Sequence, residues 1–392
     1  MVSDSLVRRR RLEPLDWVGL GLFALGLLGM ATGIVPLRDA EGTMHRVVPL
    51  LLFLGTVIVL AELTARAEVF DVVATWLARL GRGRYPVLFA LCVGFATLVT
   101  AILNLDTTAV LLTPVMLALA TRLGVSPLPF AMTTVWLANT ASLLLPVSNL
   151  TNLLAADKIG LSPVGFALRM ALPELASVLA TAACLWLLYW RRQSGARYEV
   201  PDTHRPPDRT LTGIAAAACV LFVVLVLVGV PLEAAAPICA VIVVGAFVAR
   251  DRSALRWSLV PWQLLVLVTG LFLVMDAIGR LGLSDLLRAM LGDDPGIGQV
   301  AAAGAVLANV VNNLPAYVAV EAVVPPDALF GLLVGVNVGP IVAPWASVAT
   351  LLWYERCRSA GVPISWWRFA ATGLLTAVVA LAAAIGALIL VR

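Results

Sequence analysis

The sequence predicts an all-α polytopic membrane protein. Hydrophobic residues fill 61% of its 392 positions and charged residues only 13%. The mean hydropathy is +0.98, far above that of water-soluble domains. Long apolar runs recur at roughly the 20-residue length that a helix needs to cross a bilayer, and the shorter alternating segments of a membrane barrel are not seen. We expect about nine crossing helices, two re-entrant hairpins, and two inverted-topology repeats with discontinuous helices.

Nine apolar segments are long enough to cross the membrane. They lie at about 17–36, 46–65, 128–157, 163–190, 212–230, 234–250, 258–280, 328–356 and 367–390. Two further apolar segments, 86–121 and 297–324, are interrupted midway by the polar runs NLDTT and NVVNN. Each arm is then too short to cross, so both segments are predicted to enter and leave on one side.

The arginines predict the orientation of the chain. With the N-terminus in the cytoplasm, 20 of the 27 Lys and Arg residues fall on the cytoplasmic side, as the positive-inside rule requires. We therefore expect a multi-pass plasma-membrane protein. Its predicted units are a cytoplasmic segment with the first helix (1–45), a first repeat (46–190), a polar cytoplasmic linker (191–210) and a second repeat (211–392).

The two halves resemble each other in sequence. The stretch LANTASLLLPVSNLTNLL lies beside GVNVGPIVAPWASVATLL, with matches at a constant offset of 198: Asn139 with Asn337, Pro146 with Pro344, and Asn152 with Thr350. Upstream, Glu62 matches Asp276 and Asp71 matches Asp285. The expected topology runs the two halves in opposite directions, which is the architecture of secondary transporters with a site near the midplane.

Four polar interruptions are predicted to build that site, because irregular backbone persists in a membrane only where protein or a wet cavity satisfies it. Asn, Ser and Thr side chains donate and accept hydrogen bonds, which suits a small oxygen-rich solute or a partly dehydrated cation. The candidate solute- or ion-binding residues are Asn104, Asp106, Thr107, Thr108, Asn139, Ser148, Asn149, Asn152, Asn312, Asn313, Asn337, Ser347 and Thr350.

Asp106 is predicted to carry the coupling charge, because an acid at a hairpin tip inside the membrane is costly and functional. Glu62, Glu174 and Asp276 are interpreted as scaffold or interface contacts. We expect no catalytic residue, cofactor, resident metal or nucleic-acid partner: the histidines lie in loops, and no phosphate loop, metalloprotease motif or nucleophile–base set occurs.

Several stretches resemble the ArsB family of arsenite and antimonite efflux permeases. They are LLTPVMLALA, NTASLLLPVSNLTNLLAAD, NVVNNLPAYV, GVNVGPIVAPWASVATLLW and GVPISWWRF. That family is part of the ion-transporter superfamily, which also holds sodium-coupled dicarboxylate, citrate and sulfate carriers. The resemblance implies export of trivalent metalloid acids in exchange for protons, in some members with a cytoplasmic ATPase subunit.

The chain departs from the family pattern at both kinds of interruption. Leu105 stands before the tip Asp where the family has Asn, and Trp345 and Ala346 stand before the Ser of the second broken helix where it has Ile-Gly. Trp345 is expected to reshape the cavity. Two alternatives remain open: a sodium-coupled symporter of small anions, and the membrane subunit of an ATPase-driven pump. The interruptions hold no Arg or Lys, which argues against a multiply charged anion held by ion pairs.

Overall fold

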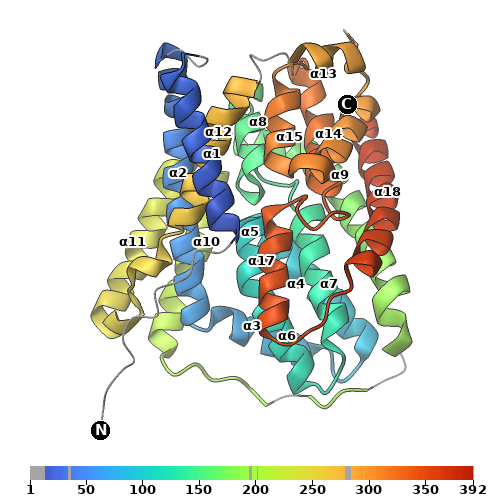
Figure 1. Cartoon of the computed structure of the whole chain (residues 1–392). Helices are drawn as coiled ribbons and strands as arrows, with labels where there is room; N and C mark the ends of the chain where they lie inside the picture. Colours follow the sequence, from blue (N-terminus) through green and yellow to red (C-terminus); the bar gives the residue numbers. More distant parts are fainter. Residues whose placement is uncertain are drawn as a thin grey trace.

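The computed structural model is a bundle of helices that runs between two polar ends (Figure 1). The structure describes residues 14–33, 37–193, 197–200, 202–278, 284–292 and 294–391. Within these ranges β-pairing is limited to one isolated bridge, between Arg84 and Arg197. The predicted all-α class is confirmed, whereas the cytoplasmic segment before Pro14 lies outside the described residues.

The helices follow each other with short connections. The first part holds α1 (Pro14–Ala31), α2 (Leu37–Arg66), α3 (Val69–Leu80), α4 (Tyr85–Leu103), α5 (Leu105–Thr107), a π-helix (Thr108–Leu112), α6 (Thr113–Arg122), α7 (Pro127–Thr140), α8 (Leu150–Ile159) and α9 (Pro163–Leu185). The second part holds α10 (Arg209–Leu227), α11 (Leu232–Arg250), α12 (Trp262–Ile278), α13 (Ser284–Leu291), α14 (Ile297–Val311), α15 (Asn313–Glu321), α16 (Leu329–Val338), α17 (Val348–Ser359) and α18 (Trp366–Leu390).

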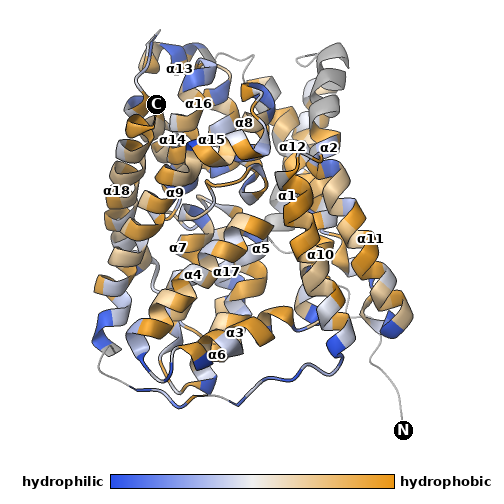
Figure 2. Ribbon diagram, turned by 180° about the vertical axis from the view of Figure 1, so that it is seen from behind, coloured by the Kyte–Doolittle hydropathy of each residue, from blue (hydrophilic) through white to orange (hydrophobic). Residues whose placement is uncertain are grey.

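Apolar surface wraps the middle of the bundle. Figure 2 shows hydrophobic residues along the central length of the outer helices and hydrophilic residues gathered at the two ends. Large apolar side chains such as Leu168, Val241 and Val378 are exposed there, as expected for surface that faces lipid. Seven helical stretches in the described chain are long and apolar enough to cross a bilayer, and shorter apolar helices accompany them. The seven include Tyr85–Leu103 and Leu105–Arg122, the two arms predicted from the sequence to be too short to cross.

Both predicted re-entrant hairpins are present. The helix α3 contacts both α4 and α6, so the segment that begins at Tyr85 returns to the same end of the molecule at Arg122. At the opposite end, α13 contacts α15, and Gln299 near the start of α14 donates to the carbonyl oxygen of Leu291 in α13 at 3.1 Å. The two hairpins therefore open toward opposite ends of the bundle, as Figure 1 shows.

The broken helices also run in opposite directions. The chain passes from α7, nearer the linker end, to α8, nearer the opposite end, whereas it passes from α16, nearer that opposite end, to α17, nearer the linker end (Figures 1 and 2). The outer helices pair across the two halves: α1 of the first part packs along α12 of the second, and α11 of the second packs along α2 of the first. The inverted arrangement is thus visible in the packing. The exact unit boundaries at 46, 191 and 211 stay a prediction.

Some elements differ from the sequence prediction. The helix α2 begins at Leu37, well before the predicted span, because residues 37–46 are polar but helix-compatible. The helix α3 was not predicted. Its apolar residues recur at helical spacing, which buries Phe70, Ala74 and Leu77 and leaves Trp76 exposed.

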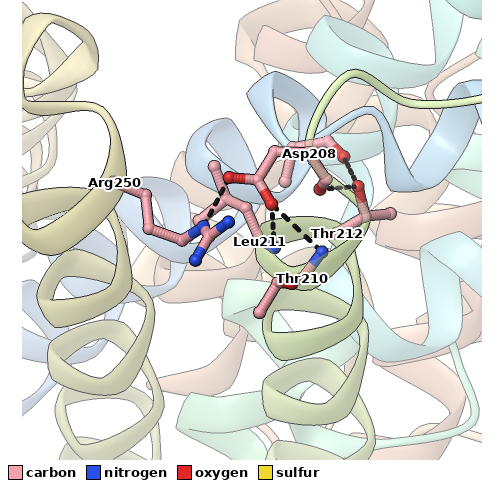
Figure 3. Close-up of polar contacts among 6 residues, drawn as sticks. Asp208, Thr210, Leu211, Thr212 and Arg250 are labelled. Carbon is pink, nitrogen blue, oxygen red and sulfur yellow. Dashed lines mark hydrogen bonds and ion pairs between the residues drawn. The ribbon is translucent and has the colours of Figure 1, made fainter.

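The linker is tied to the helices at its two ends. Tyr198 donates its hydroxyl to the carbonyl oxygen of Ala78 at 2.7 Å. Asp208 caps α10 by accepting from the backbone amides of Thr210 and Leu211 at 3.1 and 3.0 Å, and its other oxygen pairs with Arg250 at the end of α11 (Figure 3). The hydrogen bond from the Arg250 guanidinium lowers the pKa of the Asp208 carboxyl below its ordinary value.

The close approach of α16 to α14 depends on Gly335, where an added Cβ would overlap the backbone carbonyl of Ala301. We expect Gly335→Ala to destabilise the protein by about 1–3 kcal/mol through overpacking. The matched control is Gly386→Ala in α18, where no atom lies within 4 Å of the added Cβ. That change should be neutral or slightly stabilising, because alanine favours helix. Thermal unfolding in detergent measures both, and an equal fall in the two variants would contradict the close approach.

Candidate functional site

Two breaks interrupt the crossing helices at the centre of the bundle: residues 141–149 (the first break) and residues 339–347 (the second break). Proline and glycine explain where they occur. Pro146 lies in the first break, and Gly339, Pro340 and Pro344 lie in the second, where they cannot continue a helix. Each helix restarts from an extended N-cap residue, Asn149 (φ −151°) or Ser347 (φ −145°).

Asn337 joins the two halves of the molecule. Its Oδ1 accepts from Asn149 Nδ2 at 2.9 Å and from Thr151 Oγ1 at 2.7 Å, and its Nδ2 donates to Asn152 Oδ1 at 2.7 Å. All four side chains are at most 1% exposed. The last turn of α16 is therefore bonded to the first turn of α8 by three buried hydrogen bonds.

The first break is closed by side chains that bond its own backbone. Asn152 donates to the carbonyl oxygens of Ser142 and Leu145 at 2.7 and 3.0 Å. Ser148 donates to the carbonyl oxygen of Ala101 in α4 at 2.9 Å, which fastens the break to the first hairpin. These contacts replace the hydrogen bonds that the interrupted helix cannot make.

The second break is fastened to the second hairpin. Asn309 in α14 donates to the carbonyl oxygen of Gly339 at 2.9 Å and accepts from the amide of Ala343 at 3.0 Å. The Asn312 side chain donates to the carbonyl oxygen of Trp345 at 2.9 Å, and the backbone amide of Asn313 donates to the carbonyl oxygen of Ala346 at 2.8 Å. Each hairpin thus supports the break of its own half.

Trp345 lies at the second break, and its effect on the shape of a cavity stays a prediction. Its side chain is 54% exposed, and its indole Nε1 donates to the carbonyl oxygen of Asn309 at 3.0 Å. The side chain therefore covers the junction between the second break and the tip of the second hairpin.

The two hairpins turn at asparagines with a backbone that favours glycine. Asn104 has φ 87° and Asn312 has φ 136°. Asn104 Oδ1 accepts from the amide of Thr107 at 2.9 Å, and its carbonyl oxygen accepts from Thr108 Oγ1 at 2.7 Å. The helical turn that follows holds Asp106, which is partly exposed and has no hydrogen-bond or ion-pair partner among the described residues.

One group of predicted residues has unused hydrogen-bonding capacity. Thr107 Oγ1, Asn139 Oδ1, Ser347 Oγ and Thr350 Oγ1 are buried without a partner in the described chain. Thr107 lies on α5, Asn139 on α7, and Ser347 and Thr350 at the start of α17, and these three helices contact one another. Asp106 lies on α5 as well. We call the junction of α5, α7 and α17 with these five residues the polar junction.

The helix packing places these residues at one level. Trp353 on α17 donates its Nε1 to the carbonyl oxygen of Ala131 on α7 at 2.9 Å, and the two helices run antiparallel. At about 1.5 Å per residue, Ser347 lies about 9 Å and Asn139 about 12 Å above this contact, so the two residues differ in height by about 3 Å. The polar junction therefore lies at the depth of the breaks.

The thirteen predicted residues divide into two sets. Asn104, Thr108, Ser148, Asn149, Asn152, Asn312, Asn313 and Asn337 bond protein groups and hold the breaks and tips together. Asp106, Thr107, Asn139, Ser347 and Thr350 form the polar junction. Sequence reasoning missed Thr151, although it lies between two predicted residues, and it interpreted Glu174 as scaffold.

Hydroxyls and amides dominate the polar junction, with a single carboxyl and no basic side chain. Such side chains can donate and accept hydrogen bonds, which suits a solute that does both. In the described part of the chain, no group of three or more His, Cys, Asp or Glu side chains could hold a metal ion. The five cysteines are free, and none lies in a break or a tip.

The family model for the citrate transporter family matches residues 12–350. The chain belongs to this family. The arsenical pump membrane protein of Escherichia coli (strain K12) is 29% identical over 390 residues, which cover 91% of this chain and 90% of that protein. An uncharacterized transporter of Mycobacterium tuberculosis (strain ATCC 25618 / H37Rv) is 26% identical over 358 residues, which cover 84% of this chain and 83% of that protein.

A solved structure has the same fold. The crystal structure of the Alcanivorax borkumensis YdaH transporter, described as having an unusual topology, superposes with a TM-score of 0.53 at 16% identity. The match covers 95% of this chain and 96% of that one. The protein is thus a multi-pass secondary transporter of the citrate transporter family, with the broken-helix architecture that the sequence predicted.

Asn337→Ala should destabilise the transporter by about 2–4 kcal/mol, because it leaves Asn149, Asn152 and Thr151 with unpaired buried groups. The control is Asn139→Ala at the matching position of the other half, where only one bond, to the carbonyl oxygen of Val135 in its own helix, is lost. It should cost about 1 kcal/mol. Thermal unfolding in detergent compares the two, and an equal cost would show that Asn337 does not join the halves.

Proposed function

We propose that this transporter exports arsenite and antimonite in exchange for protons. The observation that supports it is the polar junction, where uncharged hydroxyl and amide oxygens are buried without partners beside one acid, Asp106. Arsenous acid is uncharged at neutral pH and carries three hydroxyl groups that donate and accept hydrogen bonds. Such a solute would satisfy Thr107, Asn139, Ser347 and Thr350 without bringing a charge into the membrane.

The chemistry of the junction favours a neutral solute over citrate. A multiply charged anion buried in the membrane needs cationic partners, since unpaired buried charges are very costly. The breaks and tips contain no Arg or Lys. The arsenical pump relatives, which match nearly the whole chain, support the same choice.

Asp106 is the proposed coupling group. A carboxyl without a counter-charge at this depth is neutral when protonated, and ionising it costs free energy. The protonation of Asp106 and the binding of solute therefore affect each other. In this proposal the protein lies in the plasma membrane with the N-terminus and the linker on the cytoplasmic side. The arginines at the linker end, including Arg82, Arg122 and Arg250, support that orientation.

A second candidate is a sodium-coupled symporter of small anions. The family description, citrate transporter, favours it, and so do the N-termini of α8, α15 and α17 near the breaks, because the positive end of a helix dipole attracts a carboxylate. A third arrangement adds a cytoplasmic ATPase subunit that drives the same metalloid export. The three candidates differ in what drives transport: a proton gradient for the proposed exchange, a sodium gradient for the symporter, and ATP for the pump.

Transport by purified protein in liposomes is the test. An imposed proton gradient should drive arsenite uptake without sodium or ATP, and Asp106→Asn should abolish gradient-driven uptake, because asparagine cannot bind or release the coupling proton. The control Asp285→Asn changes a carboxylate whose side chain is 85% exposed and should have no effect. Sodium-dependent anion uptake with no arsenite flux would replace the proposal with the symporter, and flux that appears only with ATP and a second subunit would replace it with the pump.

A pair of threonines separates solute contact from scaffold. Thr350→Val removes a buried hydroxyl without a partner, so thermal stability should stay level or rise while the KM for arsenite increases about tenfold. Thr151→Val removes a hydroxyl that donates to Asn337, so stability should fall by about 1 kcal/mol. If Thr350→Val lowers stability and leaves KM unchanged, Thr350 does not contact the solute.

A further inference from the structure

The structure assigns a second proton-carrying group to this transporter: Glu174 on α9, at the first break. Its side chain is 5% exposed, and its Oε2 accepts from the backbone amide of Leu143 at 2.9 Å. Its Oε1 is buried without a hydrogen-bond partner in the described chain. One oxygen thus holds an unwound amide of the break, and the other is free to carry a proton. The inference rests on the proposed exchange of protons.

The surroundings of Glu174 offer no counter-charge. The helix α7 and the first break contain no charged residue, and the charged residues of α10 and α18 lie at their starts, as Arg209 and Arg368. On α9 itself, Arg169 donates to the carbonyl oxygen of Val391 near the opposite end. The remaining titratable side chains on α9, on the π-helix that follows it and on α10 are Cys184, Tyr189 and Cys219.

The second half shows that the scaffold does not need a carboxyl at this junction. There α18 meets the second break through Gly373, where an added Cβ would overlap the carbonyl oxygen of Ile341. The residue Ile341 corresponds to Leu143 at the offset of 198 that relates the two breaks. Bare backbone therefore closes one junction, whereas the other holds an acid. In the second half the amide of Ile341 donates to the carbonyl oxygen of Gly339 at 2.8 Å, so the matching amide needs no carboxyl. An ionisable acceptor for Leu143, buried at a cost in free energy, therefore calls for a functional reason.

The chemical step is simple. Oε1 of the carboxylate binds one proton arriving from one side of the membrane, and the carboxyl releases it to the other side, with no other bond made or broken. When neutral, Glu174 keeps its bond to the amide of Leu143. When Glu174 is ionised, its hydrogen bond to the Leu143 amide is stronger, because a charged acceptor bonds an amide more strongly. The stronger bond pulls on the backbone of the first break. Protonation of Glu174 is thereby connected to Asn149 and Asn152 through the backbone of the break.

Glu174→Gln tests the inference, because glutamine still accepts from Leu143 but cannot carry a proton. In liposomes, gradient-driven arsenite uptake should fall at least about tenfold, while arsenite counterflow at equal pH on both sides stays unchanged. The control is Glu321→Gln, a second buried glutamate that pairs with the only lysine, Lys158, at 3.6 Å. In this variant the coupling of arsenite uptake to the proton gradient should stay intact.

Three results would overturn the inference. Gradient-driven uptake and counterflow that fall together would make Glu174 structural, and uptake that keeps the wild-type rate would show that it carries no transported proton.

If wild-type protein moves no metalloid at all, the proposed function fails separately. Infrared titration of the purified protein then decides on Glu174 without substrate: a titrating carboxylic-acid band present in wild type and absent in Glu174→Gln supports a proton-carrying group, and identical spectra overturn it.

Discussion

The structure depends on satisfying the backbone of two helices that break inside the membrane. Water is absent at this depth, so each free amide or carbonyl costs several kcal/mol unless protein bonds it. The transporter meets this constraint with asparagines. Asn152 and Asn309 bond the carbonyls of their breaks, and Asn337 reaches across the molecule to join α16 to α8. The inverted repeats are thus connected through hydrogen bonds as well as through packing.

These bonds also explain why the polar junction stands apart. The two halves contain matching residues, but Asn149 and Asn152 bond Asn337, whereas their counterparts Ser347, Thr350 and Asn139 keep unpaired atoms. Native proteins rarely leave buried polar atoms unpaired, and the exceptions call for an explanation. Four such atoms in the described chain belong to α5, α7 and α17, which contact one another beside Asp106. Unequal bonding of two similar halves separates the groups that hold the fold from the groups that are free for a solute.

Much of the fold could be predicted from the sequence, because helix breakers and polar residues inside apolar runs have few interpretations. Pro146 and Pro344 indicated the breaks, and Asn104 and Asn312 indicated the tips. The roles within the site could not be predicted, since Asn149 and Thr350 look equally polar in sequence and only three-dimensional contact shows which one is bonded. The amphipathic helix α3 was missed because its 12 residues are too few for a crossing.

The difference between Glu174 and Gly373 carries this reasoning one step further. The junction of α9 with the first break and the junction of α18 with the second break have different residues at the contact. The shared packing of a long helix against a break therefore does not depend on either residue. The close contact at Gly373 shows that packing alone can seal a long helix against a break. At Glu174 the same seal includes an acid with one bonded and one unbonded oxygen. A buried acid is stable only while it is neutral or paired, so its energy depends on proton concentration in a way that a glycine contact cannot. An otherwise symmetric scaffold thus acquires a dependence on protons in one half, which a carrier that exchanges protons for solute requires.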